Sequence, residues 1–268
     1  MKGFILSLQS EFYKSRKTLG FWSAIILPVL LSLLVFLVMY DNSAKLAPLP
    51  GMMIWRAYSG AIINIMGVLL PFFVIFVAYS INSVEHKADT WKTLFSLPIS
   101  KWSVYAAKYF YTVFLIFVCL LLFLLFTIGT GNLLGMIKPE LRFADFHMEW
   151  ALTQVFFKLF LASLGILSIQ FLLSLIWADF LKPMGIGFVC TISGMFMVGL
   201  NWEYAYLIPY SHPMQAMVSM MPHVKGKGRD LKAEYIVNIF TKELYVGLIV
   251  AVIVFIAGYY IVQRKSVK

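Results

Sequence analysis

Six apolar runs, each long enough to cross a lipid bilayer, constrain this chain more than any other feature. They cover roughly residues 21–40, 59–82, 108–130, 153–177, 184–201 and 244–262. A spanning helix needs about 20 mainly apolar residues. Of the 268 residues, 61% are hydrophobic and 13% are charged, whereas soluble domains are about 25% charged. We therefore predict an all-α integral membrane protein, a single domain over residues 1–268 with six transmembrane helices. The short link Ala178–Pro183 predicts a tight hairpin of the fourth and fifth helices.

Positive charge indicates the orientation of these helices. Six spans place both termini on one side, and 12 of the 22 Lys and Arg residues lie on that side. Five of the other ten fall in the long segment 202–242, whereas the first group lies close to the ends of the spans. Because positive charge near span ends favours the cytoplasmic side, we predict cytoplasmic termini and an extracytoplasmic segment 202–242. The same placement explains the net charge of +10 without a nucleic-acid partner.

Residues 1–20 have the pattern of an amphipathic helix that lies along the membrane surface. An apolar stripe recurs at helical spacing and is followed by three basic residues. The stripe is Phe4, Ile5, Leu8 and Phe12, and the basic residues are Lys14, Arg16 and Lys17. In the outer segment, methionines between Pro213 and Pro222 suggest a second short interfacial or re-entrant helix, in which packing is the simpler role for these side chains.

Motifs for catalysis and for nucleotide binding do not occur in this sequence. It contains no G-x-x-x-x-G-K-[ST] loop for ATP phosphates, no H-E-x-x-H motif and no G-x-S-x-G turn. Three histidines would lie on the outer side of the membrane, namely His147, His212 and His223. They are either separate hydrogen-bonded side chains or ligands of one shared metal site. We therefore expect no catalytic residue, no resident metal and no cofactor in this chain.

Few polar residues lie within the spans. Asn64 and Gln170 are candidates for lining a substrate pathway, although such residues also serve as hydrogen bonds between helices. Lys158 lies near one end of a span, from which its ammonium group can reach the membrane surface. The central parts of the spans carry no Asp or Glu, which weakens an ion-coupled mechanism because coupled transporters usually hold ionisable groups there. A separate ATPase is then the expected source of energy.

The segment 85–101, EHKADTWKTLFSLPISK, is a polar island between the second and third spans. Its apolar positions recur at steps of three and four, which predicts a short helix ending near Ser96 because Pro98 disfavours helical geometry before it. Ser100 is the expected N-cap of the next helix. The segment is either a lever that transmits a push into the two adjoining spans or a loop that covers the membrane surface.

This segment resembles a signature of ABC-2 type permeases, E-x-x-x-x-T-W-K-x-L-x-x-x-P-[IV]-S-[KR]. The matching residues are Glu85-His86-Lys87, Thr90-Trp91-Lys92, Leu94 and Ser96–Lys101, followed by Tyr105 and Lys108. The branch that it resembles most contains permeases for lantibiotic immunity and bacitracin resistance. The wider likeness extends over nearly the whole chain.

The resemblance implies the permease subunit of an ATP-binding-cassette exporter in the bacterial cell (inner) membrane. Two ABC ATPase subunits, which bind ATP and Mg²⁺, would dock on the cytoplasmic face. A second permease copy or a paralogous permease would complete the transporter in the surrounding lipid. Residues 84–100 would form the coupling helix, with Trp91 and Leu94 as docking residues and Glu85 and Lys92 as charges at the rim. The ATPase-coupling residues are then Glu85, His86, Lys87, Thr90, Trp91, Lys92, Leu94 and Pro98.

The substrate stays open at this point. An amphipathic antimicrobial peptide fits the resemblance, and a lipid or another cell-envelope component is the alternative. An ion-coupled secondary transporter and a membrane scaffold without transport activity are hypotheses from other classes.

Overall fold

The computed structural model describes residues 2–88, 90, 98–218, 223–225, 232–234 and 237–264. In the described part of the chain, six helices are long and apolar enough to cross a membrane, which confirms the main prediction from the sequence. They are α2 (Leu19–Asp41), α4 (Gly51–Ala88), α6 (Lys101–Ile137), α7 (Glu149–Ile176), α8 (Leu181–Gly199) and α10 (Lys242–Arg264). The chain is thus a multi-pass membrane protein.

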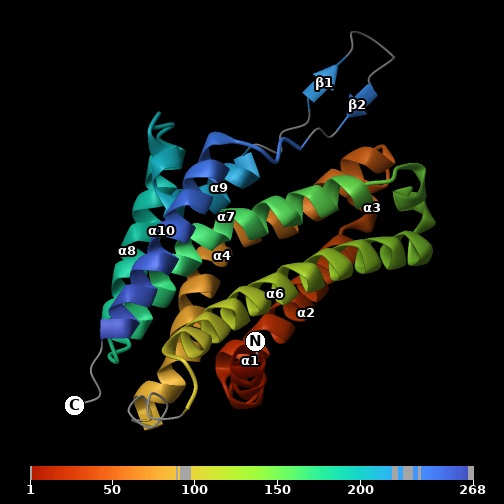
Figure 1. The fold of residues 1–268 in the computed structure, drawn as a ribbon. Coiled ribbons are helices and arrows are strands. Elements are labelled where there is room, and N and C mark those ends of the chain that lie inside the picture. The colour runs from red at the N-terminus through yellow and green to blue at the C-terminus, as the bar shows by residue number, and fades with distance from the viewer. Residues whose placement is uncertain are drawn as a thin grey trace.

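Shorter elements precede and connect these helices. The other helices are α1 (Lys2–Ser15), α3 (Ser43–Leu46) and α9 (His212–Val218), with the 3₁₀ turns η1 (Pro139–Leu141), η2 (Phe143–Asp145), η3 (Ala205–Leu207) and η4 (Pro209–Ser211). Strands β1 (His223–Lys225) and β2 (Lys232–Glu234) pair antiparallel, with Val224 opposite Ala233. This hairpin lies beyond the end of the helices (Figure 1).

The helices form a bundle in which α4 and α7 are central. The most apolar stretches of α4 and α7 are 61% buried, whereas those of α2, α8 and α10 are 22% buried. Helix α7 packs between α4 and α10, and α2 packs on α6 and α4 (Figure 1). Exposed apolar residues on the outer helices, such as Leu30, Val189 and Ile253, suit a lipid environment because hydrocarbon solvates them well.

One end of the bundle gathers α1, the last turns of α4, the first turns of α6 and the end of α10 (Figure 1). Lys101 at the start of α6 donates to the carbonyl of Gln263 in α10 at 3.4 Å. At the end of α7, the carbonyl of Ser174 accepts a hydrogen bond from His86 of α4 at 2.9 Å. We call this the base of the bundle.

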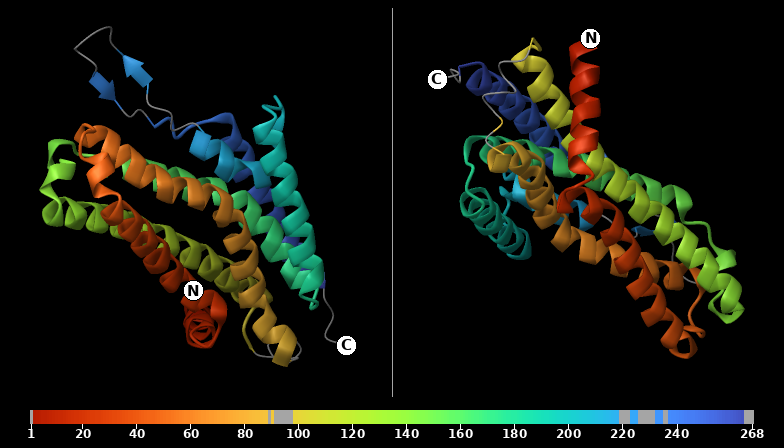
Figure 2. Two further views of the ribbon diagram at one scale, coloured as in Figure 1. Left: turned by 180° about the vertical axis from the view of Figure 1, so that it is seen from behind. Right: turned by 90° about the horizontal axis from the view of Figure 1, so that it is seen from below.

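The two helices that flank the polar island are much longer than their apolar runs. Helix α4 has 38 residues and α6 has 37, so each has a contour length of about 56 Å, against a hydrocarbon core of about 30 Å. Helix α4 bends between its two halves (Figure 2), and Pro71 lies within it. A proline inside a helix removes one backbone hydrogen bond and commonly produces such a bend.

Two predictions about helix ends are confirmed. Ser100 is the N-cap of α6, and its Oγ accepts a hydrogen bond from the backbone N–H of Ser103 at 3.2 Å. Helices α7 and α8 are joined by residues 177–180 alone, as expected for a tight hairpin.

The prediction for Lys158 was wrong. The sequence suggested that this side chain reaches the membrane surface, but it is 1% exposed and its Nζ lies 3.5 Å from Glu243 of α10. The partner comes from the first turn of a helix 85 positions along the chain, so sequence patterning within one span does not reveal it.

Small residues allow α8 to pack closely within the chain. A Cβ atom at Gly194 would lie 2.9 Å from the backbone of Tyr210 and Ser211, and one at Gly187 would overlap Gln170. In contrast, Gly185 and Gly199 face open space. In α9, Met217 packs on Gly67 of α4, which is the packing role expected for a methionine in this segment.

Candidate functional site

Helix α1 turns a polar face toward the bundle and an apolar face away from it. Ser7, Glu11 and Ser15, spaced four residues apart, are buried. Ile5 is 54% exposed and Phe12 is 41% exposed. A soluble amphipathic helix has the opposite arrangement. Polar contacts therefore hold α1 to the bundle, together with Phe4, whose ring packs edge-on against Phe110 of α6, and Leu8, which packs against the core.

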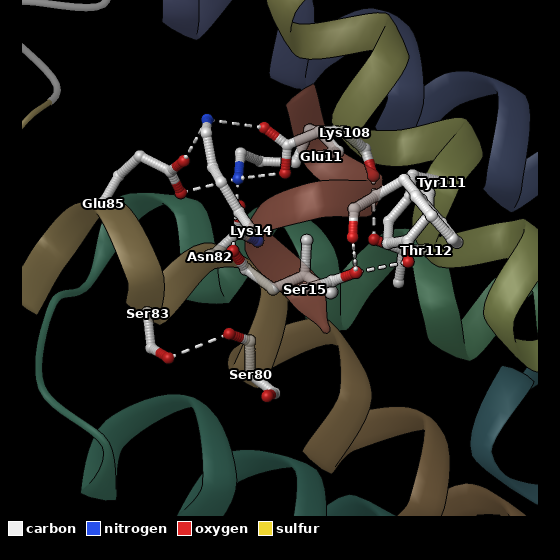
Figure 3. A network of polar contacts seen from close by, with 12 residues as sticks. Glu11, Lys14, Ser15, Ser80, Asn82, Ser83, Glu85, Lys108, Tyr111 and Thr112 are labelled. Atoms are coloured by element: carbon white, nitrogen blue, oxygen red, sulfur yellow. Dashed lines mark hydrogen bonds and ion pairs between the residues drawn. The ribbon is translucent and has the colours of Figure 1, made fainter. Parts of the chain in front are cut away.

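Those contacts form a closed ring of four charged side chains at the base of the bundle (Figure 3). Glu85, near the end of α4, accepts from Lys14 at 3.0 Å and from Lys108 at 2.6 Å. Glu11 accepts from the same two ammonium groups, at 3.1 Å and 2.8 Å. Each carboxylate offers one oxygen to each lysine. Below we call these four residues the charge ring.

The ring is electrically balanced and largely removed from solvent. Two carboxylates face two ammonium groups, and the side chains of Glu85 and Lys108 are each 1% exposed. Lys108 also donates to the carbonyl of Ile81 at 3.1 Å, so three acceptors meet its three N–H donors. Buried ions are tolerated only when they are paired and hydrogen-bonded in this way. Removal of one member would leave an uncompensated charge.

Lys14 is the most accessible member of the charge ring, with a side chain that is 30% exposed. Burial lowers the pKa of Lys14, but Glu11 and Glu85 outweigh this effect and hold its pKa above the usual lysine value. Lys14 therefore carries its positive charge at every physiological pH.

Neutral hydrogen bonds extend the connections of the ring. Ser15 of α1 is hydrogen-bonded to the hydroxyl of Tyr111 in α6. On the other side of α4, Asn82 donates to Ser174 Oγ at 2.8 Å and to the carbonyl of Phe171 at 3.2 Å. The last turns of α4 are thus bonded to α1, α6 and α7 together.

The structure locates part of the predicted coupling segment. Residues 84–88 continue α4 as its last turn, so they do not begin a separate helix. Lys87 is exposed, and the backbone N–H of Thr90 donates to the carbonyl of Glu85 at 3.1 Å. Pro98 is exposed at a bend that precedes α6. Trp91, Lys92 and Leu94 lie outside the described residues, so their docking role stays a prediction.

Glu85 and His86 are placed differently from the expectation of exposed docking charges. The carboxylate of Glu85 is 1% exposed and bound within the charge ring, so it is not a rim charge for a partner. His86 Nε2–H donates to the carbonyl of Ser174. Both side chains fasten α4 to its neighbours, which assigns them a positioning role.

The two candidate pathway residues do not face a common space within the chain. Asn64 is exposed on the first half of α4. Gln170 is fully buried and donates to the hydroxyl of Tyr210 at 2.6 Å. Through this hydrogen bond, Gln170 connects α7 to the turn η4.

Sequence reasoning missed Glu11 and Lys14 as functional candidates and treated Lys108 only as part of a motif. One signal was present: Ser7, Glu11 and Ser15 form a polar stripe at intervals of four along α1. That stripe was hidden by the more obvious apolar residues. In the described ranges, no group of three His, Cys, Asp or Glu side chains is arranged to hold a metal ion.

The charge ring therefore joins the helices on both sides of the polar island to the N-terminal helix, in a bundle of six apolar spans. A family model for ABC-2 family transporter proteins matches residues 7–194. This range contains all four residues of the charge ring. No curated protein and no solved structure matches the chain. Since the matched region covers well over half of the sequence, this chain belongs to the ABC-2 family of transporter proteins.

Proposed function

We propose that the chain is the membrane-spanning subunit of a bacterial exporter driven by two separate ABC ATPase subunits. The ATPases would bind ATP and Mg²⁺ and dock at residues 84–100, with both termini on the same cytoplasmic side. Family membership supports this proposal, because ABC-2 permeases work with an ABC ATPase partner.

The charge ring is the observation that carries the proposal. Residues 89–100 connect the end of α4 to the start of α6, and Glu85 and Lys108 lie in those two helices at 2.6 Å from one another. A force applied to the connection acts on both helices at once, and α1 follows through Glu11 and Lys14. Because packed elements shift between discrete arrangements, the base of the bundle would move as one unit.

Two features favour assembly with a second permease copy or a paralogous permease. Asn64 is exposed on a membrane-spanning helix, although an amide is unfavourable against hydrocarbon and usually meets another helix or water. Gly185 and Gly199 of α8 face open space, where a second helix could approach closely. In such a pair Asn64 would face the partner or the substrate pathway.

The proposed substrate is an amphipathic molecule, with an antimicrobial peptide as the first candidate and a lipid or other envelope component as the second. The two are separated by deleting the gene and exposing the host to a panel of cationic peptides. Increased sensitivity supports the peptide. Unchanged sensitivity across the panel favours the envelope component.

One observation favours an ion-coupled carrier as the second candidate function. Lys158 and Glu243 form a buried ion pair between α7 and α10, and ionisable groups in such positions often take part in ion movement. Transport by the purified protein alone, driven by an ion gradient and independent of ATP, would establish this function and exclude the first.

Affinity purification from the native membrane tests the main proposal. An ATPase chain with a Walker loop should copurify with the wild type, and Trp91→Ala should reduce its recovery by at least tenfold without loss of membrane insertion. Trp150, 72% exposed at the start of α7, provides the matched control: Trp150→Ala should leave recovery unchanged. A fully active protein that copurifies with no ATPase would show the proposal to be wrong.

A further inference from the structure

An open cavity of about 1030 Å³ lies beside the charge ring, at the base of the bundle. It is lined by the end of α1, the start of α2, the last turns of α4 and Phe180 in the link between α7 and α8. Ligand pockets for small molecules measure about 300–1,000 Å³, so the space suits a substantial ligand. Its lining includes the first residues of the proposed coupling segment, Val84, Lys87 and Ala88, but neither of the candidate pathway residues Asn64 and Gln170.

The mouth of this cavity is basic. Lys17 and Lys87 both line it and both are exposed. Within the described ranges, neither ammonium group lies within 4.0 Å of a carboxylate. Lys14 also lines the cavity, but its charge is balanced within the charge ring. Lys17 and Lys87 thus leave two positive charges for a ligand.

Among the described residues, one acidic side chain outside the charge ring lies close to the cavity but does not line it. Asp179 is the neighbour of Phe180 in sequence, and its carboxylate accepts from the backbone N–H of Leu181 at 3.0 Å. The hydroxyl of Tyr79, a lining residue of α4, donates to the carbonyl of Ala178, the residue before Asp179, at 3.5 Å. In the described part of the chain, two lysines without a carboxylate partner thus stand against this one carboxylate at the mouth, a local balance that favours an anion.

The walls of the cavity are apolar and aromatic. Phe76 and Val84 of α4 line it, together with Leu19 at the start of α2. Phe180 packs edge-on against Tyr79, with ring centroids 5.0 Å apart. The hydroxyls of Ser80 and Ser83 lie on the same face of α4 (Figure 3). A basic mouth above apolar walls matches a molecule with an anionic head and a hydrocarbon body.

We propose that this cavity binds an anionic phospholipid from the surrounding membrane. The phosphate would lie between Lys17 and Lys87, and the acyl chains would run along Phe76, Val84 and Phe180. The cavity is located where α2 begins and α4 ends, which is the level at which a bilayer places its headgroups. Basic pockets between helices at this level recognise anionic headgroups.

The shape of the site distinguishes a lipid from other anions. A soluble phosphate would use the lysines but gain nothing from the apolar walls, which exclude water only when hydrocarbon covers them. An uncharged apolar ligand would leave the two lysines without a partner. The proposal concerns binding only and is independent of ATP-driven transport, so its failure would not affect the proposed function.

Native mass spectrometry of the full-length protein in neutral detergent tests this site. The protein is titrated with phosphatidylglycerol and, separately, with phosphatidylcholine. Tighter binding of phosphatidylglycerol is expected, because each lysine at an anionic surface contributes about fivefold in affinity. Lys17→Gln/Lys87→Gln should therefore weaken phosphatidylglycerol binding about 25-fold. Equal binding of the two lipids, or unchanged binding by the double variant, would overturn the proposal.

Matched variants keep the result interpretable. Two other lysines, Lys182 at the start of α8 and Lys45 of α3, are exposed and do not line the cavity. Lys182→Gln/Lys45→Gln removes the same charge and should bind phosphatidylglycerol as the wild type does. A loss as large as that of the first double variant would mean that net charge alone attracts the lipid, which contradicts a specific site.

Two further arms separate the lipid from a soluble phosphate. Glycerol phosphate, which has the head without the chains, should fail to displace phosphatidylglycerol. Displacement at comparable concentrations would assign the site to soluble anions and overturn the lipid. Phe180→Ser keeps every lysine and should weaken phosphatidylglycerol binding severalfold, since Phe180 is 44% exposed and available to an acyl chain. Unchanged affinity would show that the apolar wall is not used.

Discussion

Lys108 lies 2.6 Å from Glu85, although 23 residues and the connection between α4 and α6 separate them in sequence. This pair links the two helices that a cytoplasmic partner would push. With Glu11 and Lys14 it also links them to α1. The function proposed for the chain depends on this relationship more than on any other contact.

Replacement of Lys108 by methionine should destabilise the protein strongly. The change leaves Glu11 and Glu85 buried with only Lys14 between them, and breaking a buried ion pair costs about 3–5 kcal/mol. Thermal unfolding in detergent measures the effect. Lys45→Met, at an exposed position of α3 where the ammonium group donates only to Asn42 at 3.1 Å, should shift the unfolding temperature far less, since surface substitutions usually change stability by about 0.5 kcal/mol or less. Equal shifts for the two variants would argue against a buried ring.

A methyl group at Gly20 should separate α2 from α4. A Cβ atom there would lie 2.7 Å from Ser80, whose Oγ accepts from the N–H of Gly20 at 3.1 Å. Gly20→Ala should therefore reduce the free energy of unfolding by about 1–3 kcal/mol. At Gly129 of α6 nothing lies within 4 Å of the added atom. Gly129→Ala should be neutral or stabilising by roughly 0.5–1 kcal/mol, and a comparable loss there would contradict the packing.

Stability should fall in mild acid because of His212. This side chain is fully buried, and its Nε2–H donates to the carbonyl of Tyr206 at 2.9 Å. Burial lowers the pKa of His212, and the bond to Tyr206 and the charge of Glu243 only partly offset this. The neutral form is favoured in the fold, so its contribution is present above about pH 6.5 and is lost as the pH falls below the unfolded-state value.

Unfolding temperatures at pH 7.5 and 5.5 measure this dependence. His212→Gln should be less stable at pH 7.5 but should lose less on acidification than the wild type. His147, whose side chain is 85% exposed, provides the control, and His147→Gln should keep the dependence of the wild type. The same acid sensitivity in all three proteins would assign it to other groups.

Gln170 should prove to be a structural residue. Tyr210→Phe removes the hydroxyl that accepts a hydrogen bond from the Gln170 amide. The amide N–H is then a buried donor without an acceptor, which costs about 1–3 kcal/mol. Gln170→Leu/Tyr210→Phe removes both partners and should be more stable than the sum of the two single changes predicts. Additive losses in unfolding experiments would show that the two side chains are not coupled, and would leave a pathway role open for Gln170.

The sequence predicted the features that depend on local patterning. Spans follow from runs of apolar residues, the hairpin of α7 and α8 from a short link, and the cap at Ser100 from the proline before it. The signature around Glu85 indicated the family that the comparison then showed. Each of these signals is contained in a stretch of about 25 residues or fewer.

Contacts between distant parts of the chain were beyond the reach of such patterns. Glu85 looked like a surface charge because polar residues surround it in sequence, but its partners come from α1 and α6. Lys158 looked like a snorkelling residue, but it meets Glu243 of α10. In a membrane protein a buried charge is defined by its partner, and one sequence does not show which residues become neighbours.

The proposed function requires that the charge ring transmits ATP-driven movement from the base of the bundle to the opposite, outer end, where α6 ends and α10 begins. Spin labels at Leu133 of α6 and Tyr245 of α10 report on that outer end, since both positions are exposed. For labelling, both native cysteines are first replaced by alanine, Cys119→Ala and Cys190→Ala. Only the cysteines introduced at positions 133 and 245 then react with the label.

The decisive measurement is the distance between these labels in the complex with the copurified ATPase, with and without ATP and vanadate. In the wild type the distance distribution should change on nucleotide binding. Glu85→Gln/Lys108→Gln keeps two hydrogen-bonding side chains without the charges, and it should retain the ATPase but lose most of the change. An undiminished change in this variant would contradict the account.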